Sequence, residues 1–172
     1  YFIMSNYDVS NVKDGILREY QIYSCLSENN SQCQYVAKPF DFVQRMKLNV
    51  DKYVSFLKPK DADNGNIHLS NITLLAGRSY KLHLMLLLSA SQMEASVLIR
   101  FKKVVESVVY YTAIDKITTN LTERTFAGWC PEIRNIKSSN ELDAFINNSI
   151  IPVVNKWKVN NEQSFMQLGL NS

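Results

Sequence analysis

The alternation of apolar and polar residues along the chain is clearest between Tyr80 and Leu88. Every even position of this stretch holds Tyr or Leu, while the odd positions include Lys81 and His83. Successive side chains of a strand point to opposite sides, so a two-residue period is typical of a strand with one buried face. The pattern predicts a central strand over residues 79–89.

The same alternation predicts several more strands, separated by turns. They are residues 46–56, 67–74 with a bulge, 93–101, 104–114, an edge strand at 151–159 and a closing strand at 164–170. The dipeptides Asn64–Gly65 and Ala76–Gly77 suit tight turns. Ser138 and Glu141 have the spacing of a capping box and predict one short helix. The predicted fold class is therefore mainly all-β, an antiparallel β-sandwich with one short helix.

The first 43 residues give a less regular pattern. Ile16 and Tyr20 fit either a helical stripe or one face of a strand, and Gly15 favours the strand because glycine weakens a helix. Pro39 then breaks the pattern. The chain has 172 residues, of which 46% are hydrophobic, enough for one core. We expect a segment at 1–43 packed on a sandwich domain at 44–172.

Charge and hydropathy exclude two classes of partner. The net charge of +3 comes from basic and acidic residues spread along the whole chain, whereas a nucleic-acid binder concentrates its basic residues on one face. The longest apolar run, Leu84 to Leu88, is far shorter than the roughly 18 residues that a membrane span requires. The sequence predicts neither nucleic-acid binding nor a membrane span.

Residues able to carry catalysis or bind a metal are few. His68 and His83 are the only histidines, and each is interpreted as a solvated or edge residue of its strand. Asp61 and Asp63 resemble the start of a calcium loop, but the loop would need Gly where Asn66 stands and Glu where Ile72 stands. The sequence predicts no enzyme activity, no cofactor and no metal.

The three cysteines, Cys25, Cys33 and Cys130, show no metal-binding spacing. Cys25 and Cys33 flank a short polar segment and are the candidate disulfide pair, since a bridge closing such a loop is geometrically reasonable. The alternative, that all three are ordinary thiols, has equal weight. Four glycosylation sequons, at Asn29, Asn71, Asn120 and Asn147, exceed the chance expectation too little to decide the compartment.

Surface aromatic and basic residues are the better lead to function. Arg124, Trp129 and Arg134 fall in a stretch that predicts a loop, and loops on a rigid sandwich commonly carry recognition. Aromatic side chains bury a large area at low entropic cost, which favours contacts with proteins or sugars. These three residues are the predicted contact residues of the binding site, although core packing is the default for any single aromatic residue.

A wider resemblance rests on the turn Leu75, Ala76, Gly77, Arg78, Ser79 followed by Tyr80, Lys81 and Leu82, and on the closing strand. This order resembles the jelly-roll head shared by tumour necrosis factor ligands, complement-type globular heads and phage or virus fibre tips. The resemblance covers residues 46–172. It implies a homotrimer on a cell or virion surface that binds a protein receptor, with Met85, Leu87 and Tyr111 in the subunit contact.

Two alternatives belong to other functional classes. A carbohydrate-binding module would use Tyr53 and Tyr111 as an aromatic platform for a glycan. A secreted viral immune-evasion β-sandwich would capture a host protein. All three interpretations share a non-catalytic, extracellular recognition domain.

Overall fold

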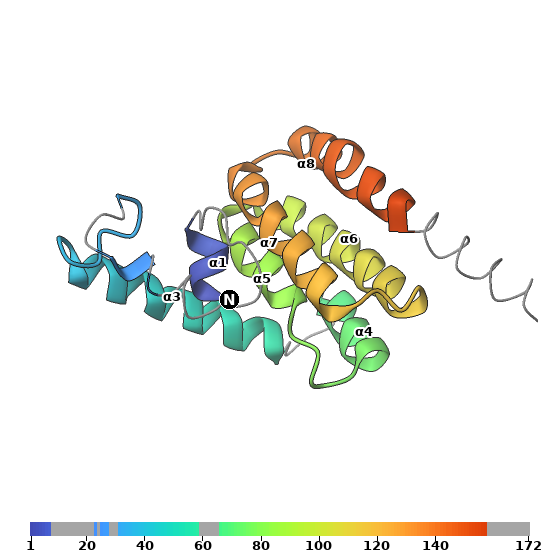
Figure 1. Cartoon of the computed structure of the whole chain (residues 1–172), viewed down its shortest axis with the longest axis horizontal. Coiled ribbons are helices and arrows are strands. Elements are labelled where there is room, and N and C mark those ends of the chain that lie inside the picture. Colours follow the sequence, from blue (N-terminus) through green and yellow to red (C-terminus); the bar gives the residue numbers. More distant parts are fainter. Residues whose placement is uncertain (8–22, 24, 28–30, 59–65, 158–172) are drawn as a thin grey trace, which may run out of the picture.

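The computed structural model describes residues 1–7, 23, 25–27, 31–58 and 66–157. Within these ranges every regular element is a helix, and no strand is present (Figure 1). The predicted β-sandwich is therefore wrong, and so is the resemblance to a jelly-roll head. The elements are α1 (Phe2–Asn6), α3 (Pro39–Leu57), α4 (Asn66–Ala76), α5 (His83–Ser89), the short 3-10 helix η1 (Ala90–Gln92), α6 (Ala95–Ile114), α7 (Thr119–Asn135), α8 (Ser139–Phe145) and η2, a π-helical turn (Ile146–Ile150).

Helix α5 lies at the centre of the bundle, and other helices surround it. It packs against α1, α3, α6 and α7 (Figure 1). Helix α4 packs along α6, and α8 also contacts α6. All seven residues of α5 are buried. Five of these seven residues are Leu or Met, and they belong to the main hydrophobic core.

The central strand predicted at residues 79–89 is therefore wrong, since residues 83–89 form the central helix α5. The even positions from Leu82 to Leu88 are buried as predicted, but the odd positions His83, Met85 and Leu87 are buried as well. Lys81 is the one Lys, Arg, Asp or Glu residue in this stretch, and it precedes the helix. The apparent two-residue period arose because Leu recurs at the even positions. It did not mark a buried and an exposed face, since the odd positions are buried too.

The other predicted strands within the described residues are helices for a related reason. Residues 93–101 and 104–114 belong mostly to the single helix α6, whose buried face includes Val97, Phe101, Val105 and Val109. A spacing of four satisfies a period of two and also brings side chains to one side of a helix. The strand predicted at 46–56 is part of α3, the one at 67–74 is part of α4, and residues 151–157 are helical.

Three predicted boundaries are confirmed. Ser138 and Glu141 form the capping box that begins α8, with the Ser138 hydroxyl accepting from the Glu141 amide. Gly77 ends α4 with φ of +82°, a left-handed conformation that glycine adopts without strain. Pro39 occupies the first turn of α3, where its missing N–H costs nothing. The π-helical turn η2 precedes Pro152, which lies inside a continuing helix.

A smaller cluster of buried residues lies beside the main core. Tyr7, Cys25 and Cys33 pack on Phe42 of α3. Helix α3 crosses the boundary between the predicted segment 1–43 and the predicted domain 44–172. The turn predicted at Asn64–Gly65, the acidic pair Asp61 and Asp63, and the closing strand at 164–170 lie outside the described residues.

Candidate binding surfaces

One side of α3 carries several exposed apolar side chains. Its buried face, formed by Phe42, Asn49 and Phe56, lies against the rest of the bundle. Beside this face, large apolar side chains are exposed to solvent over four turns of the helix. This α3 strip consists of Phe40 (82% exposed), Val43 (56%), Met46 (39%), Val50 (52%) and Val54 (48%).

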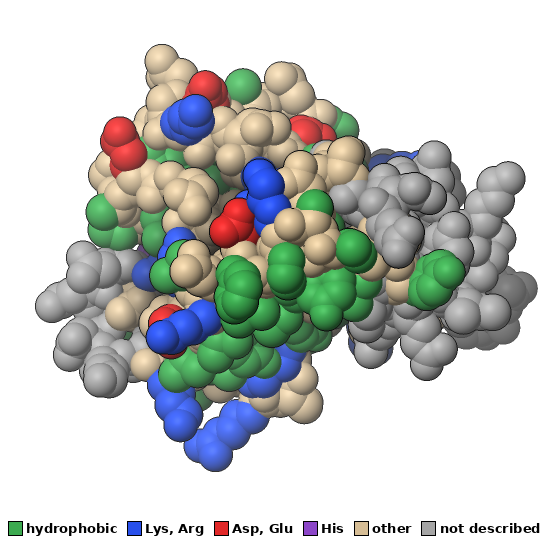
Figure 2. Space-filling model, turned by 90° about the vertical axis from the view of Figure 1, so that its left-hand side faces the viewer, with side chains coloured by type: hydrophobic (Ala, Val, Ile, Leu, Met, Phe, Trp, Pro, Cys, Tyr) green, Lys and Arg blue, Asp and Glu red, His purple; other side chains and the backbone are tan. Residues whose placement is uncertain are grey.

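The five residues of the α3 strip lie on one side of the helix. At 3.6 residues per turn, its five residues fall within about a third of the helix circumference. Figure 2 looks at the end of the molecule where α3 begins, and shows apolar side chains gathered in a continuous band with Lys and Arg side chains beside it. Contiguous exposed apolar surface of this kind is typical of interaction sites.

An apolar hollow adjoins the strip between α1 and α3. It has a volume of about 220 Å³ and is lined by Tyr1, Phe2, Met46, Asn49, Val50, Tyr53 and Leu88. Met46 and Val50 belong to both the hollow and the strip. A partner that covers the strip could therefore insert one side chain between the two helices.

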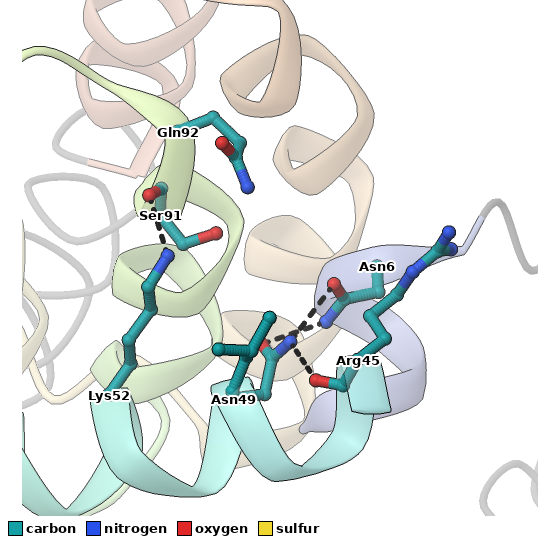
Figure 3. Close-up of a pocket in the computed structure, with 7 residues that line it drawn as sticks. Asn6, Arg45, Asn49, Lys52, Ser91 and Gln92 are labelled. Atoms are coloured by element: carbon teal, nitrogen blue, oxygen red, sulfur yellow. Dashed lines mark hydrogen bonds between the residues drawn. The ribbon is translucent and has the colours of Figure 1, made fainter. Parts of the chain in front are cut away.

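A second, polar hollow lies on the opposite side of α3 (Figure 3). Its volume is about 260 Å³, and its lining comes from α1, α3 and the η1 turn: Asn6, Arg45, Leu48, Asn49, Lys52, Ser91 and Gln92. The amides of Asn6 and Asn49 pair across the α1–α3 contact, with Asn6 Nδ2 donating to Asn49 Oδ1 at 3.0 Å. Lys52 Nζ donates to the Ser91 carbonyl at 2.8 Å. The two hollows thus share Asn49, but the lining of the first is mainly apolar and that of the second is mainly polar.

The three predicted contact residues lie on α7 and do not form a loop. Trp129 is buried, and its ring stacks on Phe126 and meets the Phe145 ring edge-on. Arg134 donates to the Ser5 carbonyl at 3.1 Å, and burial lowers the pKa of its guanidinium. Arg124 is exposed. The structure does not bring these side chains together on one surface.

The residues predicted for the subunit contact are mostly interior. Met85 and Leu87 are fully buried in α5, inside the chain's own core. Tyr111 is half-buried on α6. Met85 and Leu87 are therefore not available at the surface for a contact between subunits.

The predicted disulfide pair lies in the smaller cluster. Cys25 and Cys33 are free thiols, both buried. Burial and the adjacent Cys33 thiol raise the pKa of Cys25 to about 12. The two sulfurs are therefore close neighbours, and the disulfide stays a prediction.

The two histidines occupy structural positions. His83 is buried, stacks on Tyr80 with ring centroids 5.7 Å apart, and has its pKa lowered to about 4, mainly by burial. His68 of α4 pairs with Glu106 of α6, which also accepts from the Asn71 amide at 2.7 Å. The amide of the sequon at Asn71 is thus engaged in the α4–α6 contact. No group of metal-ligating side chains occurs among the residues that the structure describes.

Comparisons with other proteins do not identify a family. The chain matches no protein-family model, no curated protein and no solved structure. Of the helices in the described part of the chain, none combines the length and apolar character needed to cross a membrane. The sequence pattern did not predict the α3 strip, because Phe40 and Val43 fell in the segment 1–43, whereas Met46, Val50 and Val54 fell in the strand predicted at 46–56. A helical period applied to Phe40, Val43, Val50 and Val54 would have grouped them on one side.

Proposed function

We propose that this chain is a non-catalytic recognition domain that binds a protein partner through the α3 strip. The observation that supports this proposal is the strip itself, five large apolar side chains in solvent beside a helix face that is already packed. Leaving such a surface in water costs free energy, at roughly 25 cal/mol per Å² of apolar area, and burying it under a partner recovers that energy.

The shape of the surface favours a helical partner. Residues 40 to 54 of α3 span about 21 Å at 1.5 Å per residue, which matches a partner helix of about four turns. Amphipathic helices commonly lay their apolar face along an apolar surface and insert anchoring side chains into hollows. The apolar hollow beside Met46 and Val50 is suited to one such anchor. The strip is mainly aliphatic, which favours a protein over a sugar that would stack on aromatic rings.

The chemistry of the nucleophilic side chains favours a binding role over catalysis. Burial raises the pKa of the Cys130 thiol to about 11 and that of Cys25 to about 12, so both are protonated and weakly nucleophilic at neutral pH. His83 is enclosed in the core and His68 is engaged by Glu106. These groups have structural partners and none is presented to a substrate.

The test uses a photo-crosslinking amino acid at position 43 in the full chain, introduced in cells that express it. We expect a discrete crosslinked protein that is lost when Val50→Lys is added. Leu74→Lys is the matched control, because Leu74 is 83% exposed on α4 and lies outside the strip. Equal loss with Leu74→Lys, or crosslinks to a second copy of the chain alone, would contradict the proposal. Light scattering of the purified chain identifies that second case independently.

A further inference from the structure

The polar hollow on the other side of α3 is a separate feature from the α3 strip. Two cationic side chains lie toward its two ends, Lys52 beneath Ser91 and Arg45 beside Asn6 (Figure 3). The remaining polar lining consists of amides and one hydroxyl, and no carboxylate lines the hollow. Its lining therefore carries two formal positive charges with no acidic residue to balance them.

The hydrogen-bond donors of this lining are only partly used. Lys52 gives one of its three N–H bonds to the Ser91 carbonyl, so two remain for a ligand. The Arg45 guanidinium lies 5.6 Å from the centre of the Tyr7 ring, and Tyr7 can engage only part of its five N–H donors. In contrast, Asn6 and Asn49 bond to each other and are largely satisfied. The unused donors thus belong mainly to the two cations.

The electrostatics favour an anion in this position. Burial lowers the pKa of Lys52, which means that its ammonium group has lost part of its hydration. Among the residues that the structure describes, no carboxylate lies within ion-pair distance of Arg45 or Lys52. An oxyanion would restore the lost solvation with charge-assisted hydrogen bonds, which are the stronger kind.

The dimensions of the hollow narrow the class of ligand. Its volume of about 260 Å³ exceeds that of a single small ion, since one water occupies about 30 Å³ in the liquid. Arg45 and Lys52 are separated by about two turns, or roughly 10 Å along the helix axis. We propose that the polar hollow binds an organic anion with two acidic groups, one facing Lys52 and one facing Arg45. Two carboxylates of a free small molecule and two acidic side chains of a peptide share this chemistry.

The experiment is a titration of the isotope-labelled full chain by NMR, with succinate and acetate as probes. We expect saturable shifts at Lys52 and Gln92 with succinate, and weaker binding of acetate, which can engage only one cation. Lys52→Gln and Arg45→Gln should each weaken succinate binding on the order of tenfold, the effect of losing one hydrogen-bonded charge. Lys47→Gln is the control, since it removes the same charge from an exposed position of α3 that does not line the hollow.

Several results would overturn the proposal. One is the absence of saturable shifts with succinate, and another is equal binding of acetate and succinate, which indicates an adventitious ion only. A third is equal weakening by Lys47→Gln and Lys52→Gln, which indicates general charge attraction. A blocked Glu-Gly-Glu tripeptide distinguishes the two sources: tighter binding than succinate assigns the hollow to a segment of a protein, and weaker binding assigns it to a free metabolite. Circular dichroism of each variant verifies that the fold is kept.

Discussion

Helices α3 and α5 are both rich in apolar residues but expose them to different degrees. Every residue of α5 is buried under neighbouring helices, whereas α3 has one packed side and one apolar side in solvent. The fold of the described chain depends on α5, and its surface chemistry is concentrated on α3. The same residue types therefore have different roles, and the surrounding helices determine which role each residue has.

The largest expected difference between the two helices is the response to an added charge. Met85→Lys places an ammonium group in the centre of α5, where no water reaches it. We expect a loss of at least about 4 kcal/mol in the free energy of unfolding, a large share of the roughly 5–15 kcal/mol that stabilises a typical domain. Circular dichroism and urea unfolding measure this loss. A Met85→Lys variant that folds as stably as the natural chain would contradict the central position of α5.

The second prediction concerns the pH dependence that α5 gives to the fold. Burial lowers the pKa of His83 to about 4 from an ordinary value of about 6.5, so the unfolded chain binds this proton more tightly than the folded chain. Stability from this group is complete above pH 6.5 and is lost as the pH falls toward 4, by about 2 to 3 kcal/mol.

His83→Phe removes the titration and keeps a ring stacked on Tyr80. Urea unfolding at pH 7 and pH 4.5 should show a smaller difference for this variant than for the natural chain. The same pH dependence in both proteins would assign the effect to other groups.

The third prediction concerns the smaller buried cluster, in which Cys25 and Cys33 pack near Phe42 at the beginning of α3. Prolonged incubation with oxidised glutathione at alkaline pH, which offsets the raised pKa of Cys25, should convert the neighbouring Cys25 and Cys33 thiols to a disulfide, with loss of two hydrogens and release of two reduced glutathiones. Closing this short loop should add about 2 to 3 kcal/mol to the free energy of unfolding. Intact mass and the urea midpoint measure both effects. Stable mixed disulfides with glutathione at these two positions would show that the sulfurs do not meet.

The smallest expected effect is on the exposed side of α3. Val43→Lys and Val50→Lys together should change the free energy of unfolding by no more than about 0.5 kcal/mol, because neither side chain is in the core. A near-neutral result here and a large loss with Met85→Lys would show that the exposed side of α3 contributes little to the stability of the fold, whereas α5 contributes much. A loss above about 2 kcal/mol, the scale of a core substitution, would mean that the strip is covered within the chain.

Local signals in the sequence predicted parts of this structure correctly. The capping box at Ser138 and Glu141, the glycine turn at Gly77 and the break at Pro39 depend on single residues with strong backbone preferences. Such preferences act within a few residues and do not depend on the rest of the fold. They therefore gave reliable boundaries even though the elements between them were assigned to the wrong class.

The elements themselves could not be assigned from periodicity. In α6, the buried residues Val97, Phe101, Val105 and Val109 are four apart, which fits a strand and a helix equally. In α5, the apolar run is too uniform to show any period, and its burial depends on helices distant in sequence. The candidate surfaces were missed for the same reason, since the α3 strip and the polar hollow exist only when α3 is helical.

The contact between Ser5 and the core has a practical consequence for anyone shortening this chain. The Ser5 carbonyl accepts from the Ser89 hydroxyl at 3.3 Å and from Arg134, and so joins the short helix α1 to α5 and α7. A helix of five residues has no stability alone, but here it shields one flank of the apolar centre. Removing residues 1–7 would expose that side of the core, so useful truncations must keep helix α1.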